Sequence, residues 1–212
     1  IIAIVLTFFL KWETIVVLCF IGAISVLYPV PILKPFGIST RLRDFPFIKI
    51  FLIALVWSAT SVILPATENG IHFQDRKDIY LVFVAQFIFI LFITLPFDIN
   101  DAKVDRTVNV KTIPAVLGTK FSKIICLILG LIYSFLMLYI FMIENWRVLN
   151  AIYLSESTII LIWILSLLLQ IYTFTQSEKA PKWMIKVVYD GSMIVYFLIL
   201  MLTTKVQWQI SD

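Results

Sequence analysis

The chain has 212 residues, of which 61% are hydrophobic and 14% charged, and its formal net charge is +4. Soluble domains are roughly 45–50% apolar and about 25% charged, so this composition is typical of a protein whose solvent is lipid. The small net charge, without any tract of basic residues, argues against a nucleic-acid partner.

Six apolar runs are long enough to cross a membrane as helices. Five carry no charge and the sixth contains Asp190; the runs cover residues 14–33, 50–67, 79–97, 124–143, 157–177 and 187–204. At about 1.5 Å per residue, such helices match a hydrocarbon core of about 30 Å. The runs lack the polar alternation of barrel strands. The expected fold is therefore all-α, a polytopic membrane helical bundle.

Residues 1–10 form a seventh, partial apolar run that does not begin with methionine. We expect the chain to start inside a transmembrane helix, with further N-terminal helices missing. The runs follow one another without a soluble insertion or an internal repeat. The sequence therefore predicts a single membrane-embedded domain over residues 1–212.

Basic residues are distributed unequally between the two sides of the expected bundle. If the spans alternate in direction, one side holds the connections 34–49, 98–123 and 178–186, with twelve of the 17 Lys and Arg residues. The positive-inside rule makes that side cytoplasmic. We therefore expect a multi-pass protein of the cell (inner) membrane, with the C-terminus on the side opposite the connection 98–123.

Three carboxylates stand together at the end of the third apolar run. Asp98, Asp101 and Asp105 have the spacing i, i+3, i+7, which places them on one helix face if the helix continues past Phe97. Like charges on one face repel, and hard oxygen ligands suit Mg²⁺, which is often shared with substrate phosphates. The alternative is a solvated acidic helix end. These two interpretations are equally compatible with the spacing.

Basic residues follow the aspartates closely. Arg106 and Lys111 are followed by Thr112, by Pro114 at an expected helix start and by Gly118. An acidic face for a metal beside basic groups for phosphate favours a polyanionic ligand over simple solubility.

The stretch DINDAKVDRTVNVKTIPAVLG, residues 98–118, resembles the second aspartate-rich motif of the UbiA family of intramembrane prenyltransferases. The family pattern is roughly D-x-x-D-x-x-x-D followed by K-T-[LI]-P-x-x-L-G, and every one of its positions is present. YPVPILK, residues 28–34, is similar to the aromatic and basic end of an earlier helix in the family. The helix pattern matches the last two-thirds of a nine-helix member.

The resemblance implies Mg²⁺-dependent transfer of an isoprenyl group from an isoprenyl diphosphate to a hydrophobic acceptor, such as a quinone precursor, within the membrane. Asp98, Asp101 and Asp105 would then hold the metal. The residues that would contact the diphosphate, in falling order of preference, are Lys111, Arg106, Arg43 and Lys34. In the family the hydrocarbon tail lies among the helices, and the cavity can open to membrane lipid.

The first aspartate-rich motif of the family, N-D-x-x-D-x-x-x-D, does not occur in residues 1–212. Either it lies upstream of Ile1 or this is a divergent member that lacks it. We expect the stretch 1–212 alone to be inactive, because it holds half of a two-motif metal site. The alternatives are a catalytically inactive membrane scaffold and, less favoured, a transporter, which would place ionisable groups near the bilayer midplane.

Asp190 is the one charge inside an apolar run, about a turn from the expected cytoplasmic end of the last span. A charge at that depth usually faces a cavity or a partner. We favour a role in lining the substrate chamber, and the alternative is an ion pair with Lys186, four residues earlier.

Overall fold

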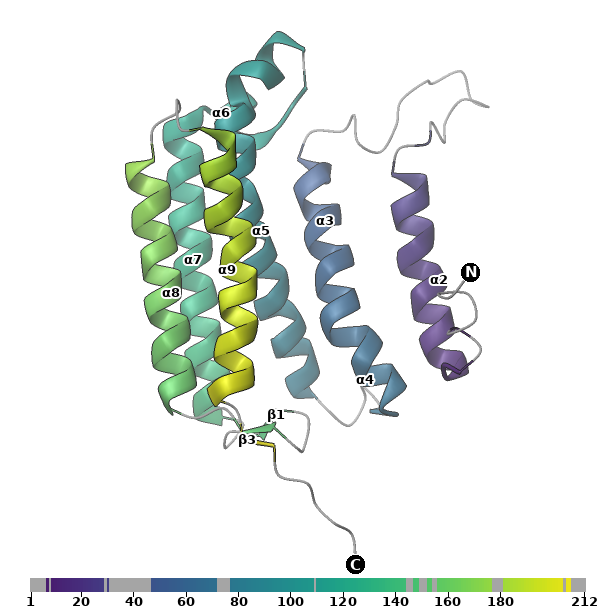
Figure 1. Cartoon of the computed structure of the whole chain (residues 1–212). Coiled ribbons are helices and arrows are strands. Elements are labelled where there is room, and N and C mark those ends of the chain that lie inside the picture. Colours follow the sequence, from purple (N-terminus) through teal and green to yellow (C-terminus); the bar gives the residue numbers. More distant parts are fainter. Residues whose placement is uncertain are drawn as a thin grey trace, which may run out of the picture. The chain divides into compact units, whose positions relative to one another are not determined.

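The computed structural model describes residues 7, 9–28, 30, 47–71, 77–108, 110–143, 147–148, 152–153, 156–176, 181–203 and 205–206. The chain divides into two compact units, Ile1–Ile90 and Leu91–Asp212. Helix α5, Lys77–Thr107, passes from the first unit into the second. Figure 1 shows the elements along the chain.

The first unit contains α2, Trp12–Leu27, and a continuous helix made of α3, Ile48–Ser58, the π-helical segment η3, Ala59–Ile63, and α4, Leu64–Glu68. The backbone N–H of Lys11 donates a hydrogen bond of 3.2 Å to Oε2 of Glu68, which ties the start of α2 to the end of α4. The first half of α5 belongs to the same unit, and the Phe51 ring of α3 lies 6.3 Å from that of Phe87.

The second unit places the second half of α5 beside three further long helices (Figure 1). These are α7, Thr119–Ile143, α8, Glu156–Thr175, and α9, Lys182–Thr203. The short helix α6, Ile113–Leu117, lies at one end of this unit. At the other end, β1, Arg147–Val148, β2, Ile152–Tyr153, and β3, Lys205–Val206, form an antiparallel sheet in the order β1-β2-β3.

A seam of small polar side chains joins α7 to α8. Ser134 Oγ and Ser166 Oγ share a hydrogen bond of 3.0 Å, and Gln170 Nε2 donates to Ser166 Oγ at 3.2 Å. Trp163 Nε1 donates to the carbonyl of Ser134 at 3.1 Å. Gly130 faces the Gln170 side chain so closely that a Cβ at Gly130 would lie 2.8 Å from its Nε2. Small residues and interhelical hydrogen bonds are the usual means of association between helices in lipid.

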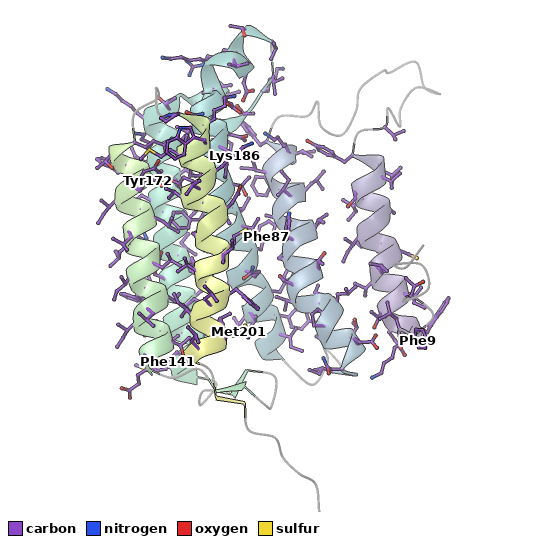
Figure 2. All side chains as sticks on the ribbon, in the orientation of Figure 1. Phe9, Phe87, Phe141, Tyr172, Lys186 and Met201 are labelled. Atoms are coloured by element: carbon purple, nitrogen blue, oxygen red, sulfur yellow. The ribbon has the colours of Figure 1, made fainter. Side chains whose placement is uncertain are left out.

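The outer faces of the helices carry large apolar side chains (Figure 2). Leu202 is 81% exposed, and Met201, labelled in Figure 2, is 63% exposed. An apolar surface of this extent is unfavourable in water and is expected against lipid tails.

The predicted fold class, a polytopic membrane helical bundle, is confirmed. Among the described residues, five helices are long and apolar enough to span a membrane: 48–68, 79–107, 119–142, 156–175 and 182–202. The helix in the first expected span, α2, has 16 residues and is shorter. The partial run 1–10 lies largely outside the described residues. The single domain over 1–212 stays a prediction.

Candidate functional site

Helix α5 carries all three predicted aspartates because it continues through Pro96 to Thr107. Proline has no N–H, so it cannot donate to the carbonyl of Phe92, four residues earlier. Cys126 of α7 donates its thiol to that carbonyl, with Sγ 3.4 Å from the oxygen. Neighbouring helices commonly satisfy a carbonyl left by a proline in this way, which allows the helix to continue to its acidic end.

The aspartates differ in burial. Asp98 is 2% exposed, whereas the side chain of Asp101 is 42% exposed and Asp105 is half-buried. Asp98 and Asp105 are seven residues apart, which corresponds to about 10 Å along the helix axis. Within the described residues, no group of three or more His, Cys, Asp or Glu side chains could hold a metal by itself. The shared helix predicted from the spacing is confirmed, but α5 alone does not form a three-carboxylate cage.

The KTIP segment folds back onto the end of α5. Thr112 is buried, and its Oγ1 donates a hydrogen bond of 3.0 Å to Oδ2 of Asp105. The backbone N–H of Val110 donates to the carbonyl of Asp105 at 2.8 Å. Pro114 occupies the first turn of α6, and Gly118 ends this helix with a φ of 86°, a conformation that favours glycine. The turn therefore fixes the Asp105 carboxylate.

Arg106 supports the same turn. Its Nη2 donates to the carbonyl of Pro114 at 3.0 Å, and its Nε donates to the carbonyl of Ala115 at 3.2 Å. The guanidinium has five N–H donors, so these two bonds leave other N–H groups for a ligand. Lys111 is exposed beside Thr112 in the sequence.

An aromatic layer around the buried Tyr189 holds α9 against α5 next to the aspartates. The ring centroids of Phe97 and Tyr189 are 5.8 Å apart, as are those of Tyr172 and Tyr189. The Tyr189 hydroxyl also shares a hydrogen bond of 2.5 Å with Oγ1 of Thr173 on α8. This packing fixes the start of α9 beside the acidic end of α5.

Lys182, the first residue of α9, makes an ion pair with Asp101, with Nζ 2.6 Å from Oδ1. In the sequence, Lys182 is one of the basic residues of the connection 178–186 and belongs to no motif. The expected placement of the connections 98–123 and 178–186 on the same side of the membrane is the feature of the sequence that could have pointed to Lys182. Figure 2 shows Lys186, one turn further along α9, at the α6 end of the unit, with Phe141 and Met201 at the other end.

The remaining predicted residues are distributed as follows. Asp190 is exposed on α9, and because α9 begins at Lys182 rather than near residue 187, it lies about 12 Å along the helix. Asp190 is therefore deeper in the helix than the sequence predicted. Lys34 and Arg43 lie outside the described residues.

Fold and site together define a polytopic helical membrane protein in which carboxylates, lysines and an arginine gather at one end of the second unit. Charged residues at the end of an apolar helical bundle are suited to a ligand that has an anionic group and a hydrophobic tail. The model of the UbiA prenyltransferase family matches residues 1–201, and the chain belongs to this family. Membership implies intramembrane prenyltransferase activity, and members generally use a divalent metal. Searches among curated proteins and among solved structures gave no match.

Proposed function

We propose that the protein transfers an isoprenyl group from an isoprenyl diphosphate to a hydrophobic acceptor within the membrane, with Mg²⁺ as the metal. The observation that carries the proposal is the acidic end of α5, where Asp98, Asp101 and Asp105 share one helix and the KTIP turn is hydrogen-bonded to it. Prenyltransferase activity follows from the family, whereas the metal, the donor and the roles of individual residues are part of the proposal.

The donor chemistry of the site fits Mg²⁺. This ion usually takes one or two carboxylates and completes its shell with water and substrate phosphates. Adjacent aspartates of α5 supply that number, so a cage of three is not required. When bound, Mg²⁺ would supply positive charge that neutralises the departing pyrophosphate. Asp105 would be presented by Thr112, and Asp98 would act from a buried position.

The basic residues act on the diphosphate. Lys111 is exposed next to the turn, and we assign to it a contact with a phosphate oxygen. Arg106 holds the turn and offers its remaining N–H groups. We assign further contacts to Arg43 and Lys34. Fixed positive charge at the leaving group lowers the barrier as the allylic C–O bond breaks and pyrophosphate leaves with the electron pair. The acceptor then bonds to the allylic carbon and releases a proton.

We also propose a chamber for the apolar parts. Asp190 on α9 would line its polar end, and an electron-rich acceptor of the quinone-precursor type would enter from the lipid. The connection that contains the aspartates would face the cytoplasm, with the C-terminus on the opposite side, as the distribution of Lys and Arg predicts. A transporter is less favoured, because the aspartates lie in the last third of α5 and Lys182 is the first residue of α9.

The experiment measures binding of farnesyl diphosphate and of inorganic pyrophosphate to the purified protein in its full length, with and without Mg²⁺. Neutralising Asp98, Asp101 or Asp105 to asparagine should weaken Mg²⁺-dependent binding about tenfold or more, since hydrogen bonds and ion contacts to charged groups contribute about 1.5–3 kcal/mol. Glu156→Gln is the matched control, because Glu156 is an exposed acid at the opposite end of the second unit.

Two results would contradict the proposal. Unchanged binding in all three asparagine variants would remove the metal role of the aspartates. Binding of farnesyl diphosphate without release of pyrophosphate, across a panel of phenolic and quinol acceptors, would favour the inactive scaffold.

A further inference from the structure

The ion pair between Lys182 and Asp101 places a cation at a proposed metal ligand. Lys182 Nζ lies 2.6 Å from Oδ1 of Asp101, and the two side chains are 65% and 42% exposed. The pair joins the first residue of α9 to the second turn from the end of α5. No role for Lys182 follows from the motif in residues 98–118, because it lies far outside that motif.

An ammonium group and Mg²⁺ would compete for the same carboxylate oxygen. Oδ1 of Asp101 is itself buried, but both side chains are partly exposed, and ion pairs between partly exposed side chains contribute little free energy. A divalent cation that also binds a diphosphate can therefore displace the lysine from Asp101. Loss of the ion pair does not separate α9 from α5, because the Phe97–Tyr189 contact is independent of it.

A displaced lysine would find a new partner close by. The lysine side chain is a flexible four-carbon stem with three N–H donors, and it binds phosphate as a point charge. Asp101 would hold the metal, and the metal would hold the diphosphate. The Lys182 ammonium group, which contacts Asp101, is therefore already close to where the phosphate oxygens would bind.

We propose that Lys182 is a diphosphate-binding residue that rests on Asp101 in the ligand-free protein and transfers to the ligand when the metal and diphosphate bind. This inference rests on the proposed function. It adds a residue from α9 to the site. In the ligand-free protein, Lys182 would neutralise the negative charge of Asp101 until the metal binds. A purely structural link between α5 and α9 is the competing explanation.

The test compares Lys182→Gln with the parent protein in two binding measurements. Without diphosphate, binding of Mn²⁺, followed by its paramagnetic resonance signal, should become about twofold to fivefold tighter, because the competing ammonium is gone. With Mg²⁺ present, binding of inorganic pyrophosphate should become about tenfold weaker, because a charged hydrogen bond is lost. Lys182→Arg should restore most of the pyrophosphate affinity.

Lys120→Gln is the control, since Lys120 is an exposed lysine in the first turn of α7, at the same end of the unit. It should leave both affinities within twofold of the parent. Opposite shifts of the two affinities in Lys182→Gln support the proposal. Unchanged pyrophosphate binding, or parallel weakening of both ligands, overturns it and identifies a structural link. If the parent protein itself fails to bind pyrophosphate with Mg²⁺, the proposed function fails, and this inference fails with it.

Discussion

The contact between Gly130 of α7 and Gln170 of α8 predicts how much Gly130→Ala should lower the free energy of unfolding. A Cβ added at Gly130 would lie 2.8 Å from Nε2, 2.9 Å from Cδ and 2.9 Å from Cγ of Gln170. The overlap includes Cγ, so rotation of the terminal amide alone does not relieve it. Gln170 is buried and donates to Ser166, and Gly130→Ala therefore displaces a hydrogen-bonded side chain from the seam.

The expected cost is the sum of two losses minus one gain. Overpacking a well-packed interface costs about 1–3 kcal/mol, and the hydrogen bond from Gln170 to Ser166, which lies within α8, contributes about 0.5–1.5 kcal/mol. Replacing glycine by alanine inside a helix stabilises the helix by up to about 1 kcal/mol. We expect Gly130→Ala to lower the free energy of unfolding by about 1–2 kcal/mol. In the double variant with Gln170→Ala the overlap is absent, so the two changes should be coupled by about 1 kcal/mol or more.

The assay uses the buried thiol of Cys126, which is 0% exposed, as a reporter of unfolding. In a Cys19→Ser background, which removes the exposed thiol, a thiol-reactive dye labels Cys126 only as the protein unfolds. Gly191→Ala is the control, because a Cβ there meets nothing within 4 Å. Gly191→Ala should be neutral or stabilising. A Gly130→Ala protein that unfolds no earlier than its parent, or additive single changes, would refute the close-approach explanation.

Two further predictions concern the end of the unit that carries the site. Lys123 Nζ donates to two carbonyls at the end of α8, at 2.5 and 3.1 Å, so Lys123→Met should lower the unfolding free energy by about 0.5–1.5 kcal/mol in the same dye assay, whereas Lys120→Met should have little effect. Thr112→Val removes the hydroxyl that donates to Asp105 and should weaken Mg²⁺-dependent pyrophosphate binding about threefold to tenfold by titration calorimetry. Thr107→Val loses only a bond within its own helix, and equal losses in both threonine variants would contradict the positioning role.

Much of the fold was predictable because the lipid solvent imposes simple rules. Backbone groups in lipid must be satisfied within the segment, so a long apolar run becomes a helix. The runs at 50–67, 79–97 and 124–143 correspond to described helices that cover or overlap them. The ends of the helices were less predictable, because hydropathy detects the apolar part only. Helix α5 continues ten residues beyond Phe97. Helix α9 begins before its apolar run, so Asp190 is further from the start of the helix than the run indicates.

The site was predictable where its residues are close in sequence. The helical spacing of Asp98, Asp101 and Asp105 placed them on one element, as the structure confirms. Contacts between distant segments were not predictable, since no local pattern specifies which face of α9 meets α5. The ion pair of Lys182 is therefore a finding of the structure. The hydrogen bond from the Cys126 thiol to the Phe92 carbonyl is another, because the two residues are on different helices.

Two groups of residues in the second unit have separate roles. Gly130, Ser134 and Ser166 join α7 to α8 along the middle of the helices. The carboxylates and lysines lie instead where α5 ends and α9 begins, and the Phe97–Tyr189 contact fixes that junction. Because the two groups share no hydrogen bond among those described, changes in the seam should alter stability without altering pyrophosphate affinity. Charge substitutions at the site should do the reverse, which allows the stability and ligand-binding roles of this membrane domain to be measured independently.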